Sequence, residues 1–103
     1  TLNLVLDNGV LRDNLGRQGY IASNGQLQFD EPPQENALVT EGFTICQDTG
    51  RLMLLGEDTF YSCLSGDFSN IYDRKIAPQC VPVYVQVIDP TLVGEMEFVV
   101  SRK

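Results

Sequence analysis

Apolar residues recur at every second position through most of the chain, in short runs that end at Gly, Asn or Asp. This period is typical of antiparallel β-strands, and no stretch keeps an apolar 3.6-residue period long enough for a helix. Leucine occupies positions 2, 4 and 6, directly before Asn8-Gly9. The same dipeptide recurs at Asn24-Gly25, between the apolar runs 20–22 and 27–29. Because Asn-Gly favours tight hairpin turns, the pattern predicts two hairpins.

The remaining apolar runs predict six further strands. Residues 30–36 contain Pro32-Pro33 and three acidic side chains, so we expect a surface loop there. Residues 65–73 are mostly small and polar, which predicts a loop carrying two aromatics, and Asp89-Pro90 and Gly94 predict the last turn. The further strands are expected at Leu38–Thr40, Phe43–Cys46, Leu52–Leu55, Phe60–Leu64, Val81–Ile88 and Glu95–Val100.

These elements predict an all-β protein, a compact antiparallel barrel or sandwich of about eight short strands. With 103 residues, 43% of them hydrophobic, we expect one domain spanning residues 1–103. A weak similarity between residues 7–20 and 48–61 leaves a β-trefoil as the alternative.

Charge and composition exclude several classes of function. Fourteen acidic against seven basic side chains give a net charge of −7, which disfavours binding to nucleic acid or to an anionic membrane. The chain has no histidine, and this removes the usual general base and imidazole metal ligands. We therefore expect no enzyme, no metal and no cofactor. Two acid pairs could in principle serve glycoside hydrolysis, Glu57 with Asp58 and Asp67 with Asp73. The adjacent pair would point to opposite faces of a strand, which leaves Asp67 and Asp73.

The three cysteines indicate an oxidising compartment. Cys46, Cys63 and Cys80 contain no C-x-x-C pair, and in a small β domain such cysteines favour disulfides and secretion. A Cys63–Cys80 bridge would close the polar loop between them, with Cys46 left as a free or intermolecular thiol. Pairing of Cys46 with either of the others stays open. Because the chain begins at Thr1, we expect a processed or excised piece whose signal peptide lies upstream.

Several motifs follow one another along the chain in a characteristic order. The first are G-R-Q-G-Y-I-A-S-N at residues 16–24 and Q-L-Q-F-D at residues 26–30. They are followed by F-Y-S-C-L-S-G-D-F-S-N-I-Y-D at residues 60–73 and Q-C-V-P-V at residues 79–83. Together these motifs resemble the C-terminal domain of Pir-type fungal cell-wall mannoproteins. The resemblance covers about residues 4 to 89. It implies a secreted, extracellular cell-wall protein.

The chain also departs from that family's pattern. The family has four cysteines, and two of them have no counterpart here, whereas Cys46 is typical of filamentous-fungal relatives. The repeats whose glutamines are thought to form ester links to glucan are absent as well. Covalent attachment to glucan is therefore not expected of this segment.

The segment 60–74 carries the candidate binding residues. Aromatic faces stack on the C–H patches of sugars, and carboxylates and amides bind hydroxyl groups. The hypothesis places wall polysaccharide, such as β-glucan or chitin, on this segment, in a protein whose role is structural. The alternative is a protein-protein interaction or self-assembly module cross-linked through disulfides. The candidate carbohydrate-binding residues are Tyr61, Asp67, Asn70, Tyr72 and Asp73.

Overall fold

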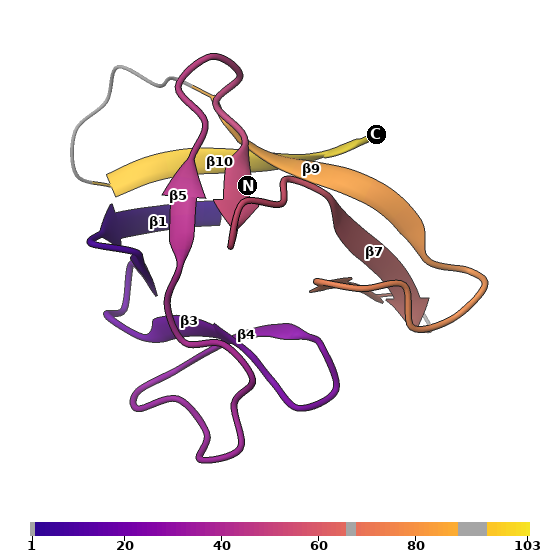
Figure 1. Cartoon of the computed structure of the whole chain (residues 1–103), viewed down its shortest axis with the longest axis horizontal. Coiled ribbons are helices and arrows are strands. Elements are labelled where there is room, and N and C mark those ends of the chain that lie inside the picture. Colours follow the sequence, from indigo (N-terminus) through magenta and orange to yellow (C-terminus); the bar gives the residue numbers. More distant parts are fainter. Residues whose placement is uncertain (1, 66–67, 89–94) are drawn as a thin grey trace.

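The computed structural model describes residues 2–65, 68–88 and 95–103, and every regular element in them is a β-strand (Figure 1). The predicted turn at Asp89-Pro90 and Gly94 lies outside the described residues. Within the described ranges, no helix is long and apolar enough to cross a membrane. The strands are β1 (Leu2–Asp7), β2 (Val10–Asp13), β3 (Gln18–Ile21), β4 (Leu27–Asp30), β5 (Phe43–Ile45), β6 (Leu52–Leu54), β7 (Phe60–Ser65), β8 (Phe68–Tyr72), β9 (Val81–Val87) and β10 (Glu95–Arg102).

Eight of these strands form one antiparallel sheet in the order β4-β3-β2-β1-β10-β9-β7-β8. The two end strands approach each other through a bridge between Gln26 and Tyr72. Beside it, the Asp73 N–H donates to the Gly25 carbonyl at 3.0 Å. The sheet is therefore a nearly closed barrel. The prediction of an all-β barrel or sandwich of about eight strands is confirmed, the barrel being the form that is observed, and the trefoil alternative is not needed.

Both Asn-Gly dipeptides lie in hairpin turns, but the two turns differ. Asn8 and Gly9 both have positive φ, 52° and 83°, as a type I′ turn requires. In the second turn only Gly25 has positive φ, 89°, and its N–H donates to the Ala22 carbonyl at 2.9 Å. The Asn24 side chain instead accepts the Gln26 N–H at 3.0 Å. An Asn-Gly pair thus predicts the hairpin without fixing its turn type.

Two predicted elements are wrong. Residues 65–73 contain strand β8, because Tyr61–Ser65 of β7 pair with Phe68–Tyr72 residue by residue and this pairing outweighs the turn-like composition. Conversely, Leu38–Thr40 is not a strand, since only Val39 forms a bridge, to Ile21. Strand β3 pairs with β2 at one position only, Gln18 with Arg12. The Val39 bridge lies further along β3, at Ile21.

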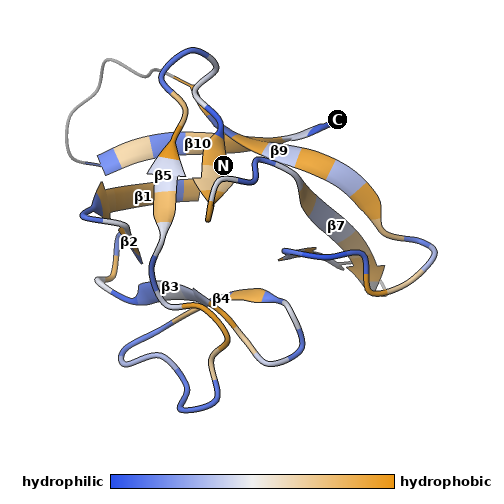
Figure 2. Cartoon of the chain, viewed as in Figure 1, coloured by the Kyte–Doolittle hydropathy of each residue, from blue (hydrophilic) through white to orange (hydrophobic). Residues whose placement is uncertain are grey.

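The main hydrophobic core lies inside the curved sheet, as the alternation of apolar and polar positions along β9 illustrates (Figure 2). The separate hairpin β5–β6 adds Phe43, Leu52 and Leu54 to this core. It is fastened there by backbone bonds, from the Phe43 N–H to the Gly9 carbonyl at 3.1 Å and from the Val87 N–H to the Gly50 carbonyl at 2.8 Å. The buried members are Leu4, Leu11, Ile21, Phe43, Leu52, Leu54, Phe60, Val83, Val85, Val87 and Phe98.

Candidate functional site

The hairpin β7–β8 gathers three of the predicted binding residues on one face. Tyr61 is directly opposite Tyr72, and Cys63 is directly opposite Asn70. Because side chains alternate along a strand, Tyr61, Asn70 and Tyr72 point to the same side. Phe60 belongs to the main core and points to the other side. Asp67, the fourth predicted residue, lies outside the described residues.

Tyr61 and Tyr72 differ in what they can offer a ligand. Tyr72 is only 8% exposed and packs against the Cys63–Cys80 disulfide, so its ring faces have no access for a sugar. Tyr61 packs on the same cluster but is only partly buried. Tyr61 and the half-buried Asn70 are therefore the members of this set that a polysaccharide can reach.

Asp73 has a structural position at the end of β8. Its carboxylate accepts from Arg74 Nε at 2.6 Å and Arg74 Nη2 at 3.0 Å. The hydrogen bond to Asp73 and its negative charge raise the pKa of Arg74 above its ordinary value. The backbone N–H of Asp73 also donates a hydrogen bond to the Gly25 carbonyl in the neighbouring turn. Asp73 thus serves the closure of the barrel.

The structure joins Cys63 and Cys80 by a disulfide. Both residues are 4% exposed, and with Tyr72 they form a small buried cluster on the outer face of β7–β8, with Tyr61 and Ala77 packed against it. This cluster is separate from the main core. The disulfide thereby supports the surface on which Tyr61 stands.

Cys46 is a free, partly exposed thiol that follows β5. A hydrogen bond from the Thr49 hydroxyl, with backbone N–H groups of Asp48 and Thr49, lowers the pKa of Cys46 below its ordinary value. The thiol borders a hollow of about 560 Å³ whose lining is mostly apolar: Leu6, Thr44, Ile45, Cys46, Gln47, Val87 and Met96.

One polar cluster on the outer face of β9 was not identified from the sequence. The Arg51 guanidinium lies 3.7 Å from the centre of the Tyr84 ring, and Lys103 Nζ lies 5.7 Å from it. Arg51 also pairs with Asp58 at 3.4 Å. The sequence did contain a signal for this position: Val83, Val85 and Val87 alternate with Tyr84, which predicts that Tyr84 points to the outer face. Pro82, on the same face of β9, pairs with Tyr61.

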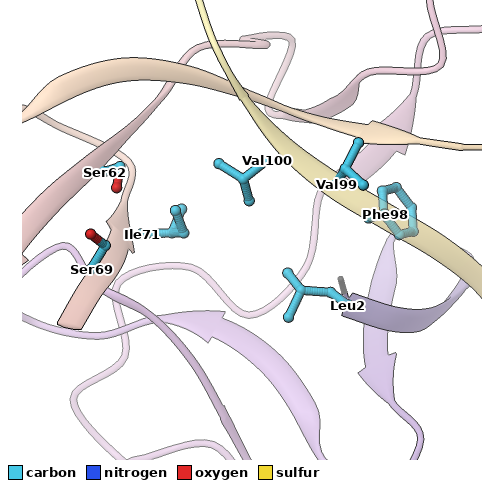
Figure 3. Close-up of a pocket in the computed structure, with 7 residues that line it drawn as sticks. All are labelled: Leu2, Ser62, Ser69, Ile71, Phe98, Val99 and Val100. Carbon is cyan, nitrogen blue, oxygen red and sulfur yellow. The ribbon is translucent and has the colours of Figure 1, made fainter. Parts of the chain in front are cut away.

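A second hollow, of about 440 Å³, opens on the inner face of the sheet between β8 and β10 (Figure 3). Ser62, Ser69 and Ile71 lie on one side of it, opposite Leu2, Phe98 and Val100. None of its lining residues titrates, so it offers no acid or base for catalysis. Among the described residues, no group of three His, Cys, Asp or Glu side chains could hold a metal ion.

These features define a small, disulfide-bonded β-barrel domain with a polar and aromatic outer face. The chain belongs to the family described as "Cell wall mannoprotein PIR1-like, C-terminal domain", whose model matches residues 9–83. The resemblance inferred from the sequence motifs is confirmed, and the expected extracellular cell-wall location agrees with the family's description.

Two relatives from Saccharomyces cerevisiae are similar to this chain. It is 46% identical over 89 residues to "Cell wall mannoprotein CIS3" and 46% identical over 89 residues to "Cell wall protein PIR5" of strain YJM789. Each alignment covers 85% of this chain, but only 39% and 31% of the two relatives. The chain therefore spans less than half the length of these relatives. No solved structure matches it.

Proposed function

We propose that this chain is a non-catalytic structural constituent of the fungal cell wall, and that residues 1–103 act as one domain. Membership in a family of cell wall mannoproteins supports the structural role. The lack of histidine, and the pairing of Asp73 with Arg74, argue against catalysis by acid and base.

The domain associates with wall polysaccharide, such as β-glucan, through the outer face of β7–β8. The observation that carries this proposal is the accessible part of Tyr61, with exposed Pro82 directly opposite on β9 and the Asn70 amide diagonally across on β8. A ring of this kind packs on sugar C–H groups, while an amide donates to and accepts from hydroxyl groups. The disulfide-supported strands beneath hold both side chains in place before binding, which lowers the entropy cost.

The test is retention of the purified domain on insoluble β-1,3-glucan, chitin and mannan, with soluble oligosaccharide as competitor. We expect Tyr61→Ala to lower the affinity for the polymer about fivefold, since packing on an aromatic ring contributes about 1 kcal/mol and each 1.4 kcal/mol corresponds to about tenfold in affinity. Leu15→Ala is the matched control, because Leu15 is 72% exposed in the β2–β3 loop, away from β7. Retention of the Tyr61→Ala variant equal to that of wild type would remove Tyr61 from the site.

A second candidate function is covalent association with another wall protein through Cys46. The partly exposed thiol and its lowered pKa favour this reading, because the thiolate is the attacking species. The Cys46 thiolate would attack a partner's disulfide and release one partner sulfur as a thiolate. Soluble sugar should not dissociate such a complex, dithiothreitol should dissociate it, and Cys46→Ser should not form it. Polysaccharide binding should instead be lost in soluble sugar and should be kept in dithiothreitol and in Cys46→Ser.

A further inference from the structure

The barrel closes at a short seam between β4 and β8. In the described part of the chain, the seam consists of the Gln26–Tyr72 bridge and the hydrogen bond from the Asp73 N–H to the Gly25 carbonyl. Beyond the seam, β4 pairs only with β3 and β8 only with β7. Very few backbone hydrogen bonds therefore hold the two strand edges together.

The residues on the β8 side of the seam are held by the disulfide cluster. Cys63 lies in β7 and Cys80 lies directly before β9, so the covalent ring that they close contains all of β8 and the segment 73–79. Tyr72 supplies the backbone of the bridge, and its side chain is buried against the disulfide. The position of Tyr72 in the bridge and the packing of its side chain therefore both depend on the Cys63–Cys80 disulfide.

Arg74 adds a second contact that depends on the same segment. Its side chain fills the space beside Gly25, where a Cβ atom would meet Arg74 Nε at 3.0 Å and Cδ at 3.1 Å. The carboxylate of Asp73 holds it there. The turn at Gly25 is consequently covered by the residues that immediately follow β8.

We propose that the Cys63–Cys80 disulfide is a redox-sensitive latch that keeps the barrel closed: its reduction releases segment 72–80, opens the β4–β8 seam and exposes both strand edges. The main core stays folded, because the disulfide cluster and the core are separate sets of residues on opposite faces of β7–β8. Open edges offer unpaired N–H and C=O groups to another strand. The observations behind the latch do not require the proposed polysaccharide contact, although Tyr61 packs against the same disulfide cluster.

The reaction needs a low-molecular-weight dithiol as the reductant. One of its thiolates attacks a sulfur of the Cys63–Cys80 bond, and the other protein sulfur leaves as a thiolate and takes a proton. The second dithiol sulfur then attacks the mixed disulfide and releases the remaining cysteine. Two protein thiols form, and the dithiol is oxidised to its own disulfide. Since both cysteines are 4% exposed, local opening of the segment precedes the attack.

Hydrogen exchange of the folded protein, with and without dithiothreitol, tests the latch. We expect the Asp73 amide, which bonds across the seam, to exchange about a hundredfold faster after reduction, in line with the entropy released from a ring of this size. The amides of Ile21 and Val87, bonded to Val39 and Gly50 in the main core, should change by less than about threefold.

Two variants complete the experiment. Cys63→Ser with Cys80→Ser should reproduce the fast exchange at Asp73 without reductant, and Cys46→Ser, which retains the disulfide, should behave as wild type. If the double variant fails to fold, reduction of the folded wild-type protein remains the decisive arm. Three results overturn the latch: uniform acceleration of core amides, unchanged exchange at Asp73, or a folded protein that dithiothreitol does not reduce.

Discussion

Tyr20 shows how one side chain links strand β3 to strand β4 on the outside of the barrel. Its ring is fully buried although it lies on the face of β3 away from the main core. The hydroxyl donates to the Asp30 carboxylate and lies 3.1 Å from Gln28 Oε1. Burial, together with the hydrogen bond to Asp30 and its negative charge, raises the pKa of Tyr20 to about 12. The neutral phenol is therefore strongly preferred in the folded state.

This preference predicts a loss of stability at alkaline pH. The unfolded tyrosine loses its proton near pH 10, while the folded one keeps it until about pH 12. The stabilisation is therefore complete below pH 10 and decreases by up to about 2 kcal/mol as the pH rises to about 12. Urea denaturation across this range should show the decrease in wild type and a smaller one in Tyr20→Phe. Equal pH profiles for both proteins would contradict the assignment to Tyr20.

The environment of Cys46 predicts selective reactivity. Since hydrogen bonds from Thr49 and from backbone N–H groups lower its pKa, iodoacetamide at neutral pH should label Cys46 and leave Cys63 and Cys80 unlabelled. Thr49→Val removes the hydroxyl that contributes most to the lowered pKa. The labelling rate of Cys46 in this variant should therefore rise with pH along a curve that lies at higher pH than the wild-type curve. Mass spectrometry of peptides gives both results, and coincident curves would exclude Thr49 as the cause.

At the scale of elements, sequence reasoning succeeded where a signal was local. The hairpins at Asn8-Gly9 and Asn24-Gly25 follow from the dihedral angles that glycine permits. Strand β8 was missed because Ser69 and Asn70 are poor strand formers, and what makes them a strand is pairing with β7. The burial of Tyr72 was missed for a related reason, since it depends on where segment 73–80 folds.

The largest single contribution of the hairpin β5–β6 to stability should come from one buried ring. Phe43 is fully buried in the main core, whereas the next residue, Thr44, is exposed. We expect Phe43→Ala to lower the free energy of unfolding by about 3–5 kcal/mol, and Thr44→Ala by less than about 0.5 kcal/mol. Urea denaturation monitored by tyrosine fluorescence measures both. A loss below about 1 kcal/mol for Phe43→Ala would mean that the hairpin packs loosely on the core.

At the scale of the whole molecule, charge and proposed ligand together make a prediction about salt. The net charge of −7 gives the protein no attraction to anionic polymers, and β-glucan itself is uncharged. Stacking on Tyr61 and hydrogen bonds from Asn70 act at short range and are not screened by ions. An approximately tenfold increase in sodium chloride should therefore change retention on β-1,3-glucan by less than about twofold. A steep decrease would mean that charged groups in the wall preparation, rather than the neutral glucan, retain the protein, and Arg51 and Lys103, on the neighbouring face of β9, would be the residues to substitute next.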